Sequence, residues 1–215
     1  MSEADRGDAV RLPLAACAAL CRGLPRAADL HAAMRIVEGV RQDLLGDGLL
    51  TVNQVLAPPD RGDAPEAIDL RRAWSSRPAQ YPVSGRKRKT QTAWTRRLLI
   101  DGEVFVGEGA DALAEAFDDS RLILSMGLRA VVNVPLLDDG GRCFATFNVL
   151  GARDRWARAD IALVELLAAF AAPQVARLGP SGEGDGAAAA QDRDGPAAGR
   201  EKTASKAEAL IGLPK

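Results

Sequence analysis

Histidine is nearly absent from this chain of 215 residues, since His31 is the only one. One imidazole cannot build a multi-histidine metal site, and the usual catalytic triads and the Cys-His dyads that need a second histidine are not expected. His31 falls on the polar side of a predicted helix, where we expect it to be a solvated surface residue. We therefore expect no metal, no cofactor and no catalytic residue set, although a carboxylate mechanism stays open.

Cysteine is also scarce. Cys17, Cys21 and Cys143 are too few and too scattered for a disulfide framework, and none has zinc-like spacing with histidines. This pattern fits a reducing compartment, so we expect a cytoplasmic protein with buried structural cysteines.

No apolar run approaches the roughly 20 residues that span a bilayer. The segment LAAC at residues 14–17 resembles a lipoprotein cleavage box, but acidic residues precede it and its apolar core is short. We interpret it as the start of a helix.

Excess charge of either sign is missing as well, because 28 basic residues face 29 acidic ones. No whole-molecule field steers the protein toward polyanions, so a nucleic-acid role would depend on a local patch. One candidate patch exists, in residues 81–99: YPVSGRKRKTQTAWTRRLL. We predict a long loop there, and such loops in compact domains are often binding loops.

Three parts follow from the pattern along the chain. Residues 1–24 form a partly helical N-terminal extension, residues 25–178 a domain, and residues 179–215 a tail that is rich in Gly and Ala and is expected to be disordered. Helical periodicity predicts long helices over 25–46 and 156–178, with Pro173 expected to kink or shorten the second. The remaining elements are strands over 49–59, 67–76, 102–109, 128–137 and 142–151, and short helices over 110–117 and 120–127.

The last two strands are joined by Asp138-Asp139-Gly140-Gly141, a composition typical of a hairpin turn. A turn centred between Asp139 and Gly140 would place Asn133 opposite Thr146. One face, here called the apolar face, should pack against the two long helices. It carries Val132, Val134, Leu136, Cys143, Ala145, Phe147 and Val149. The other, the mixed face, suits a pocket floor and carries Val131, Asn133, Pro135, Phe144, Thr146 and Asn148.

Residues 127–176 resemble a GAF domain. The resemblance rests on a strand ending in Val134-Pro135, the Gly140-Gly141 turn, a strand over 144–150, and then Trp156 and Asp160 opening the last helix. Coarser similarity extends over 25–178. Ala157 departs from the family, which often has a Ser or Thr helix cap, and Asp160 can compensate through the helix dipole.

The resemblance implies an α+β fold with an antiparallel sheet of about six strands. It places the first and last helices on one face and a ligand pocket on the other, and it implies a homodimer through the long terminal helices. The motif by which some GAF domains bind cyclic nucleotides is not traceable in this sequence. The Cys-His pair of bilin-binding domains is absent.

We therefore expect a sensory or regulatory GAF domain without its own output domain, acting through a protein partner or dimer rearrangement. Its ligand would be a small, anionic molecule. We expect no association with a membrane. We predict that the ligand contacts residues on the basic segment and the mixed face: Trp74, Arg77, Tyr81, Trp94, Arg97, Phe105, Asn133, Thr146 and Asn148.

Two alternatives stay open. Some GAF proteins, the free methionine-(R)-sulfoxide reductases, are enzymes that use cysteines near the pocket, so a small GAF-fold enzyme is the first. The second is a nucleic-acid-binding module, in which Trp74, Tyr81 and Trp94 would stack on bases beside the cations of residues 86–97. For Lys87 and Lys89 we favour a simpler role, in which they are solvated in the loop and pair with the domain's acidic residues.

Overall fold

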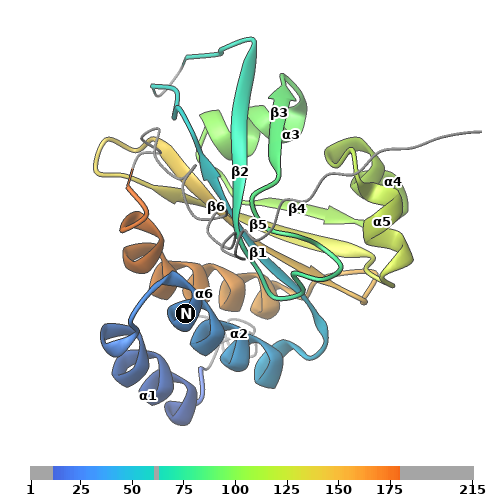
Figure 1. Cartoon of the computed structure of the whole chain (residues 1–215). Coiled ribbons are helices and arrows are strands. Elements are labelled where there is room, and N and C mark those ends of the chain that lie inside the picture. The colour runs from blue at the N-terminus through green and yellow to red at the C-terminus, as the bar shows by residue number, and fades with distance from the viewer. Residues whose placement is uncertain (1–11, 61–62, 180–215) are drawn as a thin grey trace, which may run out of the picture. The chain divides into compact units, whose positions relative to one another are not determined.

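A six-stranded antiparallel sheet organises the chain in a computed structural model that describes residues 12–60 and 63–179 (Figure 1). The strands lie in the order β3-β2-β1-β6-β5-β4. This arrangement confirms the predicted α+β class. The strand bounds are β1 Gly48–Val55, β2 Ala67–Ser75, β3 Arg86–Thr90, β4 Phe105–Glu108, β5 Ala130–Leu137 and β6 Cys143–Gly151.

Helices lie on both sides of this sheet (Figure 1). The two long ones, α2 and α6, pack together over one face, and α1 packs against α2. The segments η3, α4 and α5 belong to the other side. The helix bounds are α1 Leu14–Gly23, η2 Leu24–Arg26, α2 Leu30–Leu45, α3 Ala93–Thr95, η3 Arg96–Ile100, α4 Gly109–Ala116, α5 Ser120–Ser125 and α6 Arg158–Ala176.

Local chemistry sets the ends of α2. The Asp29 side chain accepts a hydrogen bond from the Ala32 amide at 2.7 Å, which caps the first turn. Gly46 follows the last residue with a φ of +78°, a conformation that other residues adopt at a cost. On the outer side of this helix, His31 is exposed, as expected, and it also accepts a hydrogen bond from Trp74 Nε1 at 3.2 Å.

The apolar face of the sheet forms the main core with the long helices. Phe147 and Val149 are fully buried there, as are Val164 and Leu167 of α6. Although the sequence has no unbroken apolar run of about 20 residues, α6 is long and apolar enough to cross a membrane by length and composition alone. Seven of its residues are nevertheless buried in this structure: Leu163, Val164, Leu167, Ala168, Ala171, Gln174 and Val175.

Other details of α6 follow from its sequence. Ala157 occupies the N-cap position and offers no side-chain cap, while Asp160 lies in the first turn and pairs with Arg153. The helix passes through Pro173 and ends at Ala176, two residues before the predicted end.

The predicted register of the β5–β6 hairpin was wrong. Asn133 pairs with Asn148, not with Thr146, and Thr146 pairs with Pro135. The error is an even shift of two residues, so Asn133, Thr146 and Asn148 still share the mixed face. Gly141 lies in the turn with a φ of +75°.

A β-bulge near the start of β6 reverses two of the predicted orientations. The register shifts between Leu136 and Leu137, so that Leu137 pairs with Cys143 and Phe144 is the extra residue. Cys143 therefore packs beside Trp94 and Leu98 on the mixed side, although we had placed it on the apolar face. Phe144 instead packs against the main core.

The basic segment is not the long loop that we predicted. Residues Arg86–Thr90 form the edge strand β3, paired with β2, and the chain then turns into α3 and η3. The side chains of these residues alternate between the two sides of a strand. The sequence does not reveal this alternation, because four successive residues are all basic. The expected disorder of the tail falls, beyond Gly179, on residues outside those described.

Candidate ligand site on the mixed face

Three cationic side chains from β2 and β3 meet at one place on the mixed face. Arg72 lies on β2, while Lys87 and Lys89 lie two residues apart on β3, so both project to the same side. Arg72 and Lys89 are buried and Lys87 is half-buried, whereas Arg86 and Arg88, at the alternate positions, are exposed. The pleat of one short strand therefore divides the basic run into an inner and an outer pair.

Two aromatic rings lie beside these cations. The Arg72 guanidinium carbon is 3.6 Å from the centre of the Tyr81 ring, and Lys89 Nζ is 5.7 Å from the centre of the Trp94 ring. Phe117 meets Trp94 edge-on, with their ring centres 6.0 Å apart. Cations held over ring faces in this way are stabilised by the ring quadrupole.

Two carboxylates complete the charged group, and both come from the turn between α4 and α5. Asp119 Oδ2 accepts hydrogen bonds from Tyr81 Oη and Lys87 Nζ, each at 2.6 Å, and Arg72 Nη2 is 3.8 Å away. Asp118 Oδ2 accepts from Lys89 Nζ at 2.7 Å. Lys87 and Lys89 pair with acids as expected, but they do so in a partly buried cluster and not in a solvated loop.

Burial and pairing shift the pKa values in this cluster. Burial alone would raise the pKa of the Asp119 carboxyl, but the hydrogen bonds from Lys87 and Tyr81 outweigh it and hold that pKa below its ordinary value. Burial lowers the pKa of the Lys87 ammonium more than Asp119 raises it. Burial, with the bond to Asp119, raises the pKa of Tyr81 above its ordinary range. The tyrosine is therefore a neutral donor at physiological pH.

A second polar chain runs beneath the rings. Trp94 Nε1 donates to Asn133 Oδ1 at 2.9 Å, and Asn133 Nδ2 donates to Asn148 Oδ1 at 2.7 Å. Asn148 Nδ2 continues to the Thr51 carbonyl and hydroxyl oxygens at 3.3 Å. Because Asn133 is fully buried and bonded on both sides, it positions Trp94 instead of facing the cavity.

The cavity among these groups is small, with a volume of about 30 Å³. That is room for about one or two water molecules and not for a metabolite. Its lining consists of Thr51, Asn53, Leu70, Arg72, Tyr81, Lys87, Lys89, Trp94, Phe117, Ile123, Asn148 and Leu150. Among the described residues, Arg72 Nε of the lining is buried without a hydrogen-bond partner, and so is Oδ1 of Asp119, whose other oxygen bonds to Lys87. The site is thus built but closed, with some polar capacity unused.

The predicted ligand residues divide into two groups. Tyr81, Trp94 and Asn148 line the cavity, and Asn133 supports them. Thr146 is fully buried, and its hydroxyl has no partner among the described residues. Phe105 packs in the two apolar clusters of this side.

The other three predicted residues lie elsewhere. Trp74 packs in the core of the apolar face, because its position on β2 has the opposite orientation. Arg77 pairs with Asp47 at 2.6 Å, and Arg97 is 56% exposed beside Glu103. The structure does not bring these three to the cavity.

Sequence reasoning missed Arg72, Asp118 and Asp119 as members of the site. The alternation of β2 could have shown that Arg72 shares a face with Leu70, both being buried in a strand otherwise rich in charge. No sequence signal links the carboxylates of residues 118–119 to cations some 30 residues earlier, because a long-range contact creates that pairing.

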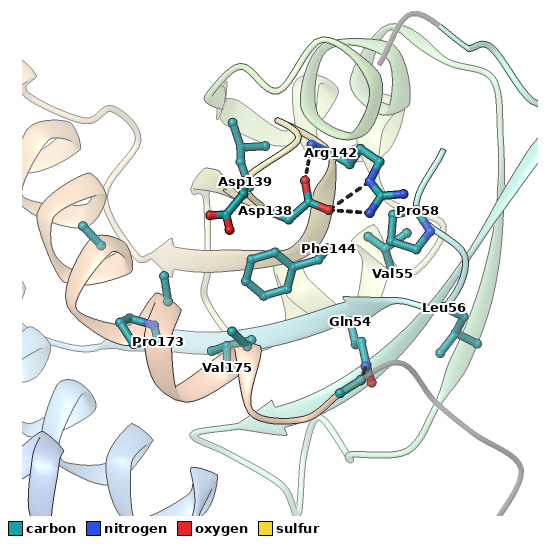
Figure 2. A pocket seen from close by; sticks show the side chains of 15 residues that line it. Gln54, Val55, Leu56, Pro58, Asp138, Asp139, Arg142, Phe144, Pro173 and Val175 are labelled. Atoms are coloured by element: carbon teal, nitrogen blue, oxygen red, sulfur yellow. Dashed lines mark hydrogen bonds and ion pairs between the residues drawn. The ribbon is translucent and has the colours of Figure 1, made fainter. Parts of the chain in front are cut away.

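A larger cavity, of about 800 Å³, lies between the C-terminal half of α6 and the bulged end of the hairpin (Figure 2). Phe144, Pro173 and Val175 form much of its apolar wall. Arg142 is the one cation among the described residues that line it, and it is paired with Asp138 at 2.9 Å and Asp60 at 3.4 Å. Size alone would favour this cavity, but its positive charge is already matched by exposed partners.

The described residues that line these two cavities include no cysteine and no histidine. Burial raises the pKa of the Cys143 thiol to about 12, and the side chain is 1% exposed. Among the described residues, no group of three His, Cys, Asp or Glu side chains could hold a metal ion.

Comparison with known proteins gives a family match for most of this structure. The family model described as the GAF domain matches residues 16–175, a span that includes all six strands and nearly all of the helices. No curated protein matches the sequence of the chain.

Several solved structures share the fold at low sequence identity. The chain resembles the GAF domain from a phosphoenolpyruvate-protein phosphotransferase of Coxiella burnetii, with 13% identity and a TM-score of 0.54 over 76% of this chain and 92% of that one. It also resembles residues 122 to 287 of a methyl-accepting chemotaxis protein, with 16% identity and a TM-score of 0.51 over 76% of this chain and 98% of that one.

A third similar structure is a bacteriophytochrome from the photosynthetic bacterium R. palustris, with 15% identity and a TM-score of 0.52 over 80% of this chain. The match spans only 39% of the bacteriophytochrome chain. These likenesses establish a shared fold and nothing more. Sequence identities this low carry no information about the ligand.

Proposed function

Because the chain belongs to the GAF domain family, we propose that it is a regulatory domain that binds a small anionic molecule at the mixed face. The observation that supports this proposal is the convergence of Arg72, Lys87 and Lys89 on one cavity beside two aromatic rings. Partly buried cations are costly unless negative charge lies close to them, so the site favours anions from solution. Tyr81 and Asn148 add neutral hydrogen-bonding groups that can fix a ligand's orientation.

Signalling from this site would pass through neighbouring elements. The cavity is lined by β1, β2, β3 and β6, and the other face of the same sheet packs against α2 and α6. We infer that ligand binding reaches a protein partner, or a homodimer formed through these long helices, in the cytoplasm. Two carboxylates from a single short turn already pair with Lys87 and Lys89, so a ligand must compete with them.

The two alternative functions receive less support. A thiol enzyme would need an accessible nucleophile, and Cys143 is buried with a raised pKa. A nucleic-acid module would need exposed rings for stacking, and Trp74, Tyr81 and Trp94 are each at most 5% exposed.

The alternation along β3 provides a matched experiment. Lys87→Gln and Lys89→Gln remove inner cations, whereas Arg86→Gln and Arg88→Gln remove outer cations from the same strand. We would screen carboxylates and phosphate esters by thermal shift and measure affinities by calorimetry. The inner variants should each weaken binding of an anion that stabilises the wild type by roughly tenfold to a hundredfold, since a charged hydrogen bond contributes about 1.5–3 kcal/mol.

The outer variants should bind that anion within about twofold of the wild type, because their side chains are exposed and screened. Equal losses from both pairs would show a diffuse surface effect and contradict the proposal. Failure of every anion to stabilise the protein would contradict it as well.

A further inference from the structure

The protein's own acidic turn, residues 117–119, pairs with the lysines that line the small cavity. This turn places the carboxylates of Asp118 and Asp119 on Lys89 and Lys87, and its Phe117 lines the cavity beside Trp94. The bonded partners are 29 to 38 residues apart in sequence, so the contact is tertiary and can break without unwinding a helix or a strand.

The burial of the partners is unequal. Lys89 is 9% exposed at its side chain, while its partner Asp118 is 78% exposed. The carboxylate therefore reaches the buried ammonium from the solvent side, along a path that an anion from solution could follow. Asp119 is more enclosed, at 23%, but its Oδ1 has no partner among the described residues.

The charge balance also remains incomplete. Three cations, Arg72, Lys87 and Lys89, face two carboxylates, and Arg72 Nε is a buried donor without a partner in the described structure. A ligand that places an acceptor oxygen beside Arg72 Nε, where neither aspartate places one, would satisfy this donor. A cavity of about 30 Å³ cannot admit such a group until the turn moves.

We propose that the turn 117–119 is an internal competitor: Asp118 and Asp119 occupy the positions of two acidic groups of the ligand, which is a compact dianion that displaces them. This inference rests on the proposed function and specifies its ligand class. Two neighbouring carboxylates on two neighbouring lysines favour a small molecule with two acidic groups, or a single phosphate ester, over a monocarboxylate. Displacement moves the turn between α4 and α5 away from β2 and β3, and this movement is the signal.

Removing the competitor should increase the affinity for dianions. We would titrate succinate, glycerol 3-phosphate and acetate into the wild type, Asp118→Asn and Asp119→Asn. Both variants should bind at least one of the two dianions about tenfold more tightly or better, because a site occupied internally in nine molecules of ten lowers apparent affinity by that factor. Acetate should remain weak in all three proteins. Succinate and glycerol 3-phosphate distinguish a dicarboxylate from a phosphate as the preferred group.

Asp101→Asn is the matched control, since Asp101 is an exposed acid whose Oδ2 is 3.8 Å from Arg96 Nε and which is not among the residues that line the cavity. It should bind as the wild type does. If Asp119→Asn does not fold, Asp118→Asn decides the matter, because the Asp118 side chain is mostly exposed. A second measurement is hydrogen exchange in residues 117–125, which should become faster when the effective dianion saturates the wild type.

The outcomes distinguish a failure of the internal competitor from a failure of the proposed function. If Lys87→Gln and Lys89→Gln weaken anion binding but neither aspartate variant changes it, the competitor is overturned and the proposed function stands. Slower exchange in residues 117–125, or acetate binding as tightly as the dianions, also overturns the competitor. If no anion binds the wild type or either aspartate variant, both proposals fail.

Discussion

The two faces of one sheet are built by different chemistry. On the apolar face, Phe147 and Val149 pack against α2 and α6. On the mixed face, Asn148 lies between these two residues in sequence and is hydrogen-bonded to Asn133. Arg72 and Lys89 are buried farther along the same side. Burial is nearly as complete on both faces, but only the mixed face buries many polar groups, whose stability depends on hydrogen bonding.

The apolar face should tolerate truncation least. Phe147→Ala removes a fully buried ring, and we expect the free energy of unfolding to fall by about 3–5 kcal/mol, as measured by urea denaturation. Leu122→Ala is the control, because Leu122 is 42% exposed and its truncation should change stability by less than about 0.5 kcal/mol. A loss below about 1 kcal/mol for Phe147→Ala would mean that the apolar face is loosely packed.

The mixed face offers a sharper test, since one of its buried polar side chains, Asn133, has hydrogen-bond partners and another, Thr146, has none for its hydroxyl among the described residues. Asn133→Leu leaves the Trp94 indole and the Asn148 carbonyl without partners and should cost about 1–3 kcal/mol. Thr146→Val removes a hydroxyl that has no partner among the described residues, so its stability should be unchanged or slightly higher. Tryptophan fluorescence should change only in the first variant. Similar losses in both variants would contradict the distinction.

Labelling of Cys143 should have the smallest effect on the protein, because the experiment changes no side chain. It measures how well the mixed face excludes a reagent from solvent. In native protein at pH 8, a thiol reagent should modify the exposed Cys21 and leave Cys143 unmodified, while urea should expose all three cysteines. Burial raises the pKa of Cys143 from 9.0 to about 12, which lowers its thiolate fraction on the order of a thousandfold.

The same shift predicts the effect of alkaline pH. The unfolded thiol ionises near 9 and the folded one near 12, so unfolding releases a proton between these values. The stability that Cys143 contributes is therefore complete below about pH 9 and is lost as the pH rises toward 12. For the labelling experiment at pH 8, rapid modification of Cys143 in the native protein would contradict the prediction, since it would show that the mixed face opens often.

The sequence predicts those features that repeat with a regular period. The apolar positions of α2 and α6 recur at helical spacing, and the alternation around Asn133 and Asn148 separates the two faces even though the predicted register is off by two residues. An even error preserves the face, and this is why the two asparagines were assigned to it correctly. Five of the six strands were therefore found.

Single-residue irregularities and long-range pairs could not be predicted. The bulge at Phe144 exchanges the sides of Phe144 and Cys143, and no local composition announces it. The strand β3 is hidden because four successive basic residues resemble a solvated loop, and only pairing with β2 gives them an alternating pattern. Trp74 was misplaced for the related reason that its orientation depends on the register of β2, which shifts beside it.

The position of β3 at the edge of the sheet has a consequence for how the protein behaves at high concentration. An edge strand presents backbone donors and acceptors that a strand of another molecule could use for growth into an aggregate. The exposed Arg86 and Arg88 bring like charges onto any copy that approaches in register, and this repulsion protects the edge. One run of four basic residues thus serves a cavity with its inner pair and colloidal stability with its outer pair.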